Sequence, residues 1–362
     1  MTTVKQINCF IDQIAPFETA MDFDNCGLLV GDPVGTVTSV LLSLDITEEV
    51  VKEAKEKGAE LIISHHPVIF KPLKRLMNGD IPYLLAKEGI HAICAHTNLD
   101  MADGGVNTCL ADCLGLQKRE PLSIYKTRNY VKIVVFVPLD QAEDVKTAMA
   151  ESGAGALGNY ERCSFSIDGI GNFLPTDGAD PFVGEQGTYE SVKETRVEMI
   201  CAPQRVEDVI AAMKKVHPYE EPAYDIFQTE AIQKMTVCGL VGELEEVQLP
   251  EVFARYVKDH LRCSGVRYTE GARQIKRVAI CSGAGGDFIY RAISCGADAF
   301  VTGEIKHHEL LLAKKAGITV VDAGHFATED LVIEPLLRTL TEQFPTVQFQ
   351  KSEVFQDITK YC

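Results

Sequence analysis

The chain has 362 residues, of which 46% are hydrophobic and 24% are charged, as in an ordinary globular protein of one or two domains. Its formal net charge of -17 argues against extensive binding to nucleic-acid phosphates. No run of about 18 apolar residues predicts a membrane span, so neither nucleic acid nor a membrane is an expected partner.

The 12 cysteines are scattered and none form a Cys-x-x-Cys pair, so neither a zinc ribbon nor a thioredoxin-like motif is predicted. The first residues lack the basic and apolar regions of a signal peptide. Free cysteines suit a reducing compartment, and we therefore expect a cytoplasmic protein.

Strands and helices alternate in the first part of the chain, residues 1–125. Helices are predicted at 4–15, 47–57, 81–87 and 107–116, and strands at 39–45, 61–63 and 91–95. This alternation predicts a mainly parallel sheet with helices on its faces.

A separate domain is predicted over residues 126–234. Strands are expected at 130–138, 162–167, 195–202 and 223–227, and helices at 141–151 and 205–215. This β-α-β-β-α-β order is the ferredoxin-like pattern. The stretch His217-Pro218-Tyr219-Glu220-Glu221-Pro222 looks reactive, but its two prolines favour a rigid turn into a strand.

The first pattern returns in residues 235–362, which we expect to form one α/β domain together with residues 1–125. Strands are predicted at 278–281, 299–302, 318–322 and 347–351, and helices at 288–295, 307–315 and from about 326 to 344. The glycine-rich loop 283–286 could cradle a phosphate or could be a tight turn.

Two adjacent histidines, His65 and His66, end the apolar run 61–63 and are followed by Pro67. Ligands of open α/β sheets bind at such strand ends. Neighbouring residues of an extended strand point to opposite faces, so one metal ion is not expected to take both imidazoles. Two neighbouring ions could take one each.

An internal echo links the two outer parts of the chain. The segment 58–66 is followed by a helix and by a strand that ends near His96. The similar segment 296–304 is likewise followed by a helix and by a strand that ends near His325. We expect two related lobes of one sheet. Six of the nine histidines lie in these units, namely His65, His66, His96, His307, His308 and His325.

Further ligands are available for a pair of ions. His325 and Glu329 are four residues apart and could share a helix face. With His65, His66 and Asp100, they suffice for two ions that keep positions open to water. We expect His96 to be either a ligand or the partner that orients Asp100. His307 and His308 are expected on a helix near the cleft. Structural hydrogen bonds are expected for His91, His217 and His260.

Several motifs give the chain a family resemblance. They are Asp24-Asn25-Cys26-Gly27, Ser64-His65-His66-Pro67, His96-Thr97-Asn98-Leu99-Asp100, Thr302-Gly303-Glu304 and Gly324-His325-Phe326-Ala327-Thr328-Glu329. The chain resembles the YbgI/YqfO family of dinuclear-metal-centre proteins, homologues of type 2 GTP cyclohydrolase I, in its long form with a CutA-like insert. The resemblance implies a ring-shaped homohexamer with its sites facing an internal cavity. It also implies metal ligands at His65, His66, Asp100, His325 and Glu329.

Two classes of function follow from these expectations. The first is a metal-dependent hydrolase acting on a nucleotide or phosphoester, in which His96 or Glu304 handles the proton. The second is a metal-binding, metal-delivery or regulatory scaffold protein without catalysis. Imidazole and carboxylate ligands suit Zn, Fe, Mn or Ni alike, so the sequence indicates neither the metal nor the substrate.

Overall fold

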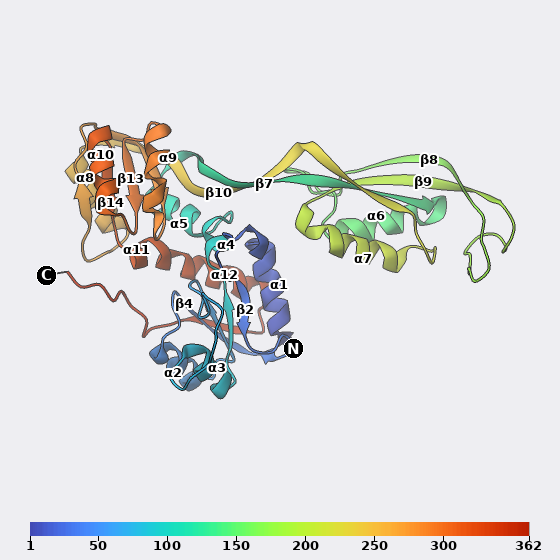
Figure 1. Cartoon of the computed structure of the whole chain (residues 1–362), viewed down its shortest axis with the longest axis horizontal. Coiled ribbons are helices and arrows are strands. Elements are labelled where there is room, and N and C mark those ends of the chain that lie inside the picture. Colours follow the sequence, from blue (N-terminus) through green and yellow to red (C-terminus); the bar gives the residue numbers. More distant parts are fainter. Residues whose placement is uncertain (362) are drawn as a thin grey trace. The chain divides into compact units, whose positions relative to one another are not determined.

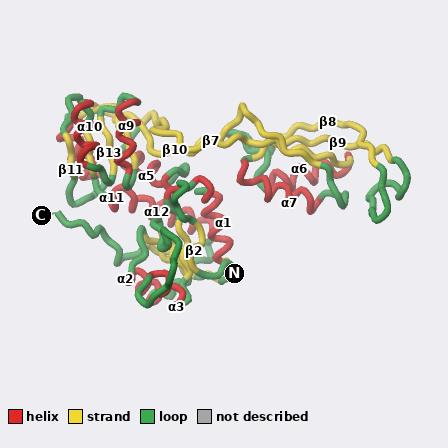
Figure 2. The backbone as a smooth tube through the Cα atoms, viewed as in Figure 1, coloured by secondary structure: helices red, strands yellow, loops and turns green. Residues whose placement is uncertain are grey.

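The computed structural model describes residues 1–361, apart from the side chain of Lys234. It is a mixed α/β structure, as predicted, with several sheets, and it divides into two compact units. The first unit combines residues 1–126 with residues 236–362, and the second comprises residues 127–235. Figure 2 shows how helices and strands are distributed along the chain.

The first sheet of the first unit has the strand order β15-β4-β5-β6-β2. Its parallel strands are β4 (Ser39–Ser43), β5 (Leu61–Ser64), β6 (His91–Cys94) and β15 (Gln348–Lys351), and β2 (Gly27–Val30) lies antiparallel to β6. Every residue of β4 and β5 is buried, because helices cover both faces of the sheet. A small pair, β1 (Thr2–Thr3) and β3 (Thr36–Val37), lies beside it.

The helices on this sheet follow from the alternation of its side chains. Val40 and Leu42 pack in one core with helices α1 (Val4–Ile14) and α12 (Ile333–Gln343). Leu41 belongs to another core, in which the sheet packs with helices α2 (Glu48–Glu56) and α3 (Ile81–Glu88). Successive residues of a strand point to opposite faces, so each strand contributes to both cores.

The second sheet of the first unit contains the strand order β11-β14-β13-β12-β10. Strands β12 (Ile275–Cys281), β13 (Ala299–Thr302) and β14 (Thr319–Asp322) are parallel, and β11 (Arg267–Thr269) and β10 (Tyr224–Gln248) pair antiparallel with β14 and β12. Helices share two cores with it: α5 (Val106–Cys113) and α8 (Pro250–His260) in one, α9 (Ile289–Ser294) and α10 (His307–Ala316) in the other.

The expectation of one continuous sheet was wrong. The echoing segments do give matching parallel triplets, β4-β5-β6 and β12-β13-β14, but in two sheets. The edges of the first sheet are occupied by β15 and β2, while β11 and β10 flank the triplet of the second. The outer strands of both triplets are thus already paired with other strands, so the two triplets do not join into one sheet.

The expected long helix after residue 325 is interrupted. Helix α11 (His325–Glu329) is followed by a 3-10 turn at Asp330–Val332, and α12 starts only at Ile333. In a continuous helix Pro335 would be an interior residue, where it lacks an N–H and clashes with the preceding turn. In the first turn of α12 it is tolerated.

The second unit has the element order β-α-β-β-α-β. Its elements are β7 (Gln117–Pro138), α6 (Ala142–Glu151), β8 (Ser164–Phe173), β9 (Glu190–Cys201), α7 (Val206–Val216) and β10. The strand order is β10-β7-β9-β8, and α6 and α7 lie on one side of this sheet (Figure 1). Both β7 and β10 extend into the first unit and are much longer than the expected strands 130–138 and 223–227.

The side chains of the insert sheet also divide between its two faces. Val135 and Val197 pack in the core with α6 and α7. Phe136 and Arg196 are cross-strand partners, and each is next to one of these valines in the sequence. Their side chains therefore point to the face opposite the helices. Among the helices formed by residues 1–361, none is both long and apolar enough to cross a bilayer.

Helix α8 offers a test of the core of the second sheet. Phe253 is fully buried, whereas the neighbouring Val252 is 53% exposed. Phe253→Ala leaves a cavity and should lower the free energy of unfolding by about 3–5 kcal/mol. Val252→Ala should change it by less than about 0.5 kcal/mol. Urea unfolding measures both, and equal effects of the two variants would contradict this packing.

His217 predicts a pH dependence for the insert. Burial lowers the pKa of His217 below its usual 6.5, and its Nε2 donates a hydrogen bond to the carbonyl of Phe136. The unfolded chain therefore binds a proton near pH 6.5 that the folded chain does not take up. Its contribution to stability is present above that pH and is lost as the pH falls below it.

Urea unfolding at about pH 7.5 and 5.5 checks this expectation, because the imidazole changes charge between these values in the unfolded chain. The wild-type insert should lose more stability on acidification than the His217→Gln variant. An equal loss in both proteins would show that His217 is not the group responsible.

Candidate metal centre

A cluster of histidines and carboxylates lies at the ends of parallel strands in the first unit. His65 and His66 follow β5, and His96 follows β6 directly before the single-turn helix α4 (Thr97–Asp100). Helix α4 carries Asp100. Helix α11 follows β14 of the second sheet and carries His325 and Glu329. Strand ends of this kind are the usual binding sites of α/β folds.

His65 has a buried nitrogen without a partner. Its Nδ1 donates to the carbonyl of Ala95 at 2.9 Å, which leaves the lone pair of Nε2 directed into the cluster. Within residues 1–361, Nε2 makes no hydrogen bond, although it lies 3.7 Å from Asp100 Oδ1 and 3.8 Å from Glu329 Oε1. Buried polar atoms are almost always satisfied, and this nitrogen belongs to a group of residues that could hold an ion.

Glu329 also faces two further imidazoles. Its Oε2 lies 3.0 Å from Nε2 of His66 and 3.0 Å from Nε2 of His325, and these two nitrogens are 3.3 Å apart. The Glu329 carboxyl group is buried, with one oxygen toward His65 and the other toward His66 and His325. One carboxylate therefore connects two sets of nitrogen atoms.

Each imidazole of the cluster is oriented through its Nδ1 atom. The acceptors are Ala95 O for His65, Asp45 for His66 at 2.9 Å, Asp24 for His96 at 2.8 Å and Glu304 for His325 at 2.7 Å. A hydrogen bond on one ring nitrogen fixes the tautomer and leaves the other nitrogen free to bind a metal.

The carboxylates also control protonation in the cluster. Burial acts to lower the pKa of His66, but Asp45 and Glu329 reverse this effect and raise it to about 10. Burial likewise opposes the shift of His325, whose pKa Glu329 and Glu304 raise to about 9. A divalent cation would compete with these protons for the same nitrogens, because ligating imidazoles must be neutral.

The cluster offers three sets of atoms close enough to share an ion. They are His65 with Asp100 and Glu329, His66 with His325 and Glu329, and His65 with His66 and His96, all with ligand atoms within 4.8 Å of one another. The first two sets share Glu329. These donors fit divalent metals that accept imidazole and carboxylate ligands.

The third set shows that His65 and His66 lie close together, although the alternation of a strand predicts that they point to opposite faces. Strand β5 ends at Ser64, so both residues lie beyond the regular strand. Their rings are only 5.1 Å apart. The alternation of a strand does not constrain side chains that follow its last residue.

Of the two roles expected of His96, the hydrogen bond to Asp100 is not formed, whereas a place as a possible ligand is available in the third set. The Nδ1 of His96 bonds to Asp24, and Asp100 instead accepts a hydrogen bond from Ser282 Oγ at 3.1 Å. The His96 ring lies 5.2 Å from the ring of His65 and 5.5 Å from that of His66. His96 therefore borders the cluster without orienting Asp100.

The glycine-rich loop forms a tight turn against the cluster. Gly283 has a φ of +55°, and a Cβ atom there would overlap the carboxylate of Glu329. Its carbonyl accepts hydrogen bonds from the N–H groups of Gly303 and Glu304, both at 2.9 Å. Close approach to Glu329 explains this glycine.

Sequence reasoning missed Asp24, Asp45 and Ser282 as members of the site. Asp45 and Ser282 follow β4 and β12, so the rule that identified the histidines at strand ends applied to them too. His307 and His308 lie on α10 and are exposed. His91, His217 and His260 bond to backbone atoms, as expected of structural residues.

Comparisons with known proteins agree with the expected resemblance. The family model described as Duf34/NIF3 (NGG1p interacting factor 3) matches residues 2–360. A Bacillus subtilis protein named GTP cyclohydrolase 1 type 2 homolog is 41% identical over 342 residues, covering 93% of this chain and 91% of its own length.

Solved structures are similar over the whole chain. The crystal structure of a Bacillus cereus protein related to NIF3 has a TM-score of 0.89 at 36% identity, covering 100% of this chain and 99% of its own. The protein ybgI, at 17% identity and a TM-score of 0.60, covers 98% and 99% and shows a likeness of fold. The chain therefore belongs to the Duf34/NIF3 (NGG1p interacting factor 3) family.

Proposed function

We propose that this chain binds two divalent metal ions and uses them as a hydrolase that acts on a nucleotide or phosphoester. The observation that carries the proposal is the partnerless buried Nε2 of His65, which faces Asp100 and Glu329. Imidazole and carboxylate groups gathered in this way are the donors that divalent metals accept in proteins. The name GTP cyclohydrolase 1 type 2 homolog, carried by the relatives, supports a nucleotide as substrate.

His65 and Asp100 would hold one ion, His66 and His325 the other, and Glu329 would serve both. Bound there, divalent ions polarise substrate oxygens and lower the pKa of water. Zn, Fe, Mn and Ni all suit these donors. Asp45 and Glu304, through Nδ1 of His66 and His325, keep each Nε2 aimed at its ion.

His96 is the residue best placed to move a proton. Asp24 accepts its Nδ1–H and also accepts hydrogen bonds from the Thr97 backbone and hydroxyl. Burial raises the pKa of Asp24, but the hydrogen bonds of His96 and Thr97 outweigh this effect and lower it well below the usual range. A charged Asp24 fixes the ring so that Nε2 can accept or donate a proton at the cluster.

Glu304 is better suited to orientation than to proton transfer. Its carboxylate is 61% exposed and is engaged by His325 Nδ1 at 2.7 Å. We assign it the support of His325.

The family resemblance further supports a homohexamer as the assembly. The strand order of the insert supports a ferredoxin-like assignment for residues 127–235.

Metal content tests the proposed ligands. The wild-type chain should bind two ions per chain, and Glu329→Gln should bind at most one, because the shared carboxylate serves both sets. His308→Ala is the control, since His308 is exposed and lies outside the three sets. Elemental analysis after dialysis gives the counts. Two ions retained by Glu329→Gln would contradict the ligand set.

Turnover tests the enzymatic part of the proposal. A panel of nucleotides and phosphoesters, with Zn, Fe, Mn or Ni added, should reveal a metal-dependent hydrolysis. His96→Gln should lower kcat by about 100- to 10,000-fold while metal content is unchanged, because general acid–base catalysis contributes that much. His307→Gln is the matched control on exposed helix α10.

Two results would contradict parts of this proposal. A full rate in His96→Gln would show that His96 is not the proton carrier. The other is no turnover across the panel combined with rapid transfer of bound metal to an apo-acceptor. That combination would instead favour a metal-delivery protein.

A further inference from the structure

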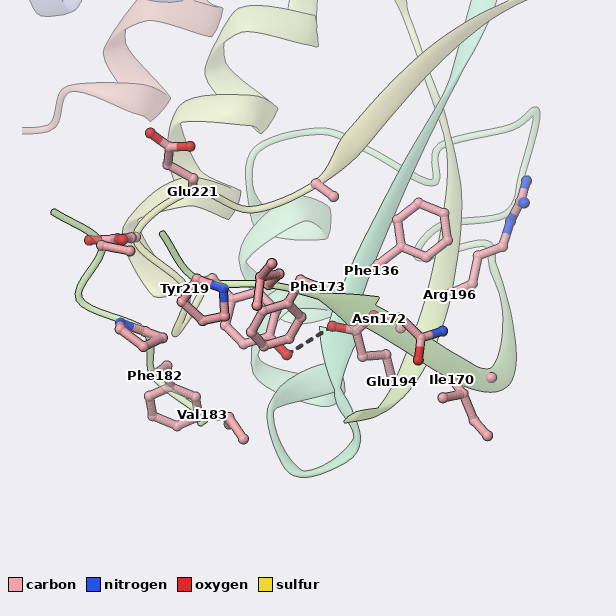
Figure 3. Close-up of a pocket in the computed structure, with 18 of the residues that line it drawn as sticks. Phe136, Ile170, Asn172, Phe173, Phe182, Val183, Glu194, Arg196, Tyr219 and Glu221 are labelled. Atoms are coloured by element: carbon pink, nitrogen blue, oxygen red, sulfur yellow. Dashed lines mark hydrogen bonds between the residues drawn. The ribbon is translucent and has the colours of Figure 1, made fainter. Parts of the chain in front are cut away.

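The insert contains a cavity of about 580 Å³ that is separate from the metal cluster. It lies on the sheet face opposite α6 and α7, where Phe136 and Arg196 project, and the chain around residues 174–183 and 219–223 encloses it (Figure 3). Cavities of about 300–1,000 Å³ are the size that small-molecule ligands occupy in proteins.

Two glycines of β8 open the floor of this cavity. Gly169 is the cross-strand partner of Glu194, and a Cβ atom at Gly169 would meet no other atom within 4 Å. A Cβ atom at Gly171 would overlap Oε2 of Glu194. The absence of a side chain at Gly171 therefore leaves room for the Glu194 carboxylate, and its absence at Gly169 keeps the space beside that carboxylate open.

The walls are aromatic and are held by the proline-rich turn. The ring of Tyr219 lies 6.2 Å from the ring of Phe173 and 6.2 Å from that of Phe182. The Tyr219 N–H donates to Nδ1 of His217, and Glu220 accepts the N–H of Asp180. The stretch 217–222 is thus a rigid support for the cavity.

Glu194 presents a carboxylate without a cationic partner. It is only 8% exposed, and its Oε1 accepts the hydroxyl of Tyr219 at 2.8 Å, the dashed line in Figure 3. Burial and Glu194 raise the pKa of Tyr219, so the hydroxyl stays protonated and keeps donating. Among residues 1–361, leaving aside the undescribed side chain of Lys234, no cationic side chain forms an ion pair with Glu194, and Arg196 is engaged by Glu198 at 2.9 Å.

The charge of the lining selects for a cation. Glu220 and Glu221 also line the cavity, and Arg196 is its one positively charged lining residue among those the structure describes. Aromatic faces attract cations in addition, and most strongly where water is excluded. Anions such as nucleotides would be repelled by these carboxylates.

We propose that the insert binds a small organic cation, a primary amine with an apolar or aromatic body. The ammonium group pairs with Glu194, and the body packs among Phe173, Phe182 and Tyr219. This site is independent of the metal cluster, since all its residues lie within residues 127–235.

Calorimetric titration of the full chain with phenethylamine tests the proposal. The amine should bind saturably, and 2-phenylethanol, which has the same body without the charge, should bind at least about tenfold more weakly because it cannot form the charged hydrogen bond. Glu194→Gln keeps an acceptor for Tyr219 and should weaken amine binding to the same extent. Phe182→Ala, in a half-exposed loop position, should also weaken it.

Glu207→Gln is the matched control. Glu207 is exposed in the first turn of α7, on the helix side of the sheet, and does not line the cavity. Its amine affinity should equal that of the wild type.

Three outcomes would overturn the proposal. One is no saturable binding up to about 10 mM amine. Another is equal affinity for the amine and the alcohol, or no effect of Glu194→Gln. The third is absent binding together with a molar mass in solution that is lower for Ile167→Lys than for the wild type. Ile167 is 54% exposed and pairs with Arg196 on the cavity face, so that result would assign the cavity to a second copy of the chain.

Discussion

The buried carboxylate of Glu329 is the interaction on which the first unit depends. It comes from α11, which follows the second sheet, and it contacts His65 and His66, which follow the first. A carboxylate buried in this way is stable only with compensating partners. Glu329 therefore couples the packing of the two sheets to the chemistry of the cluster, and Gly283 supplies the space that it needs.

The chain connectivity supports this arrangement. After β14 and α11, helix α12 packs into the core of the first sheet, and β15 joins that sheet as an edge strand beside β4. The C-terminal part of the chain thus begins in one sheet and ends in the other. The segment that crosses between the sheets carries His325 and Glu329. These two candidate ligands therefore lie beside the strand ends of the first sheet.

Much of this could be predicted from the sequence, since apolar runs such as 61–64 and 299–302 read as buried strands and place polar residues at strand ends. The division into two sheets could not, because it depends on which distant strands take the edge positions. The lengths of β7 and β10 depend on pairing in the same way. Asp45 could have been identified from its place after β4, whereas the role of Asp24 becomes visible only beside His96.

The most direct test of the account is anomalous X-ray diffraction from crystals of the metal-loaded protein. The account predicts two anomalous peaks, one beside His65 and Asp100 and one beside His66 and His325, with the Glu329 carboxylate between them. A map with no peak at this cluster, or with a single peak that leaves either pair unbound, would contradict it.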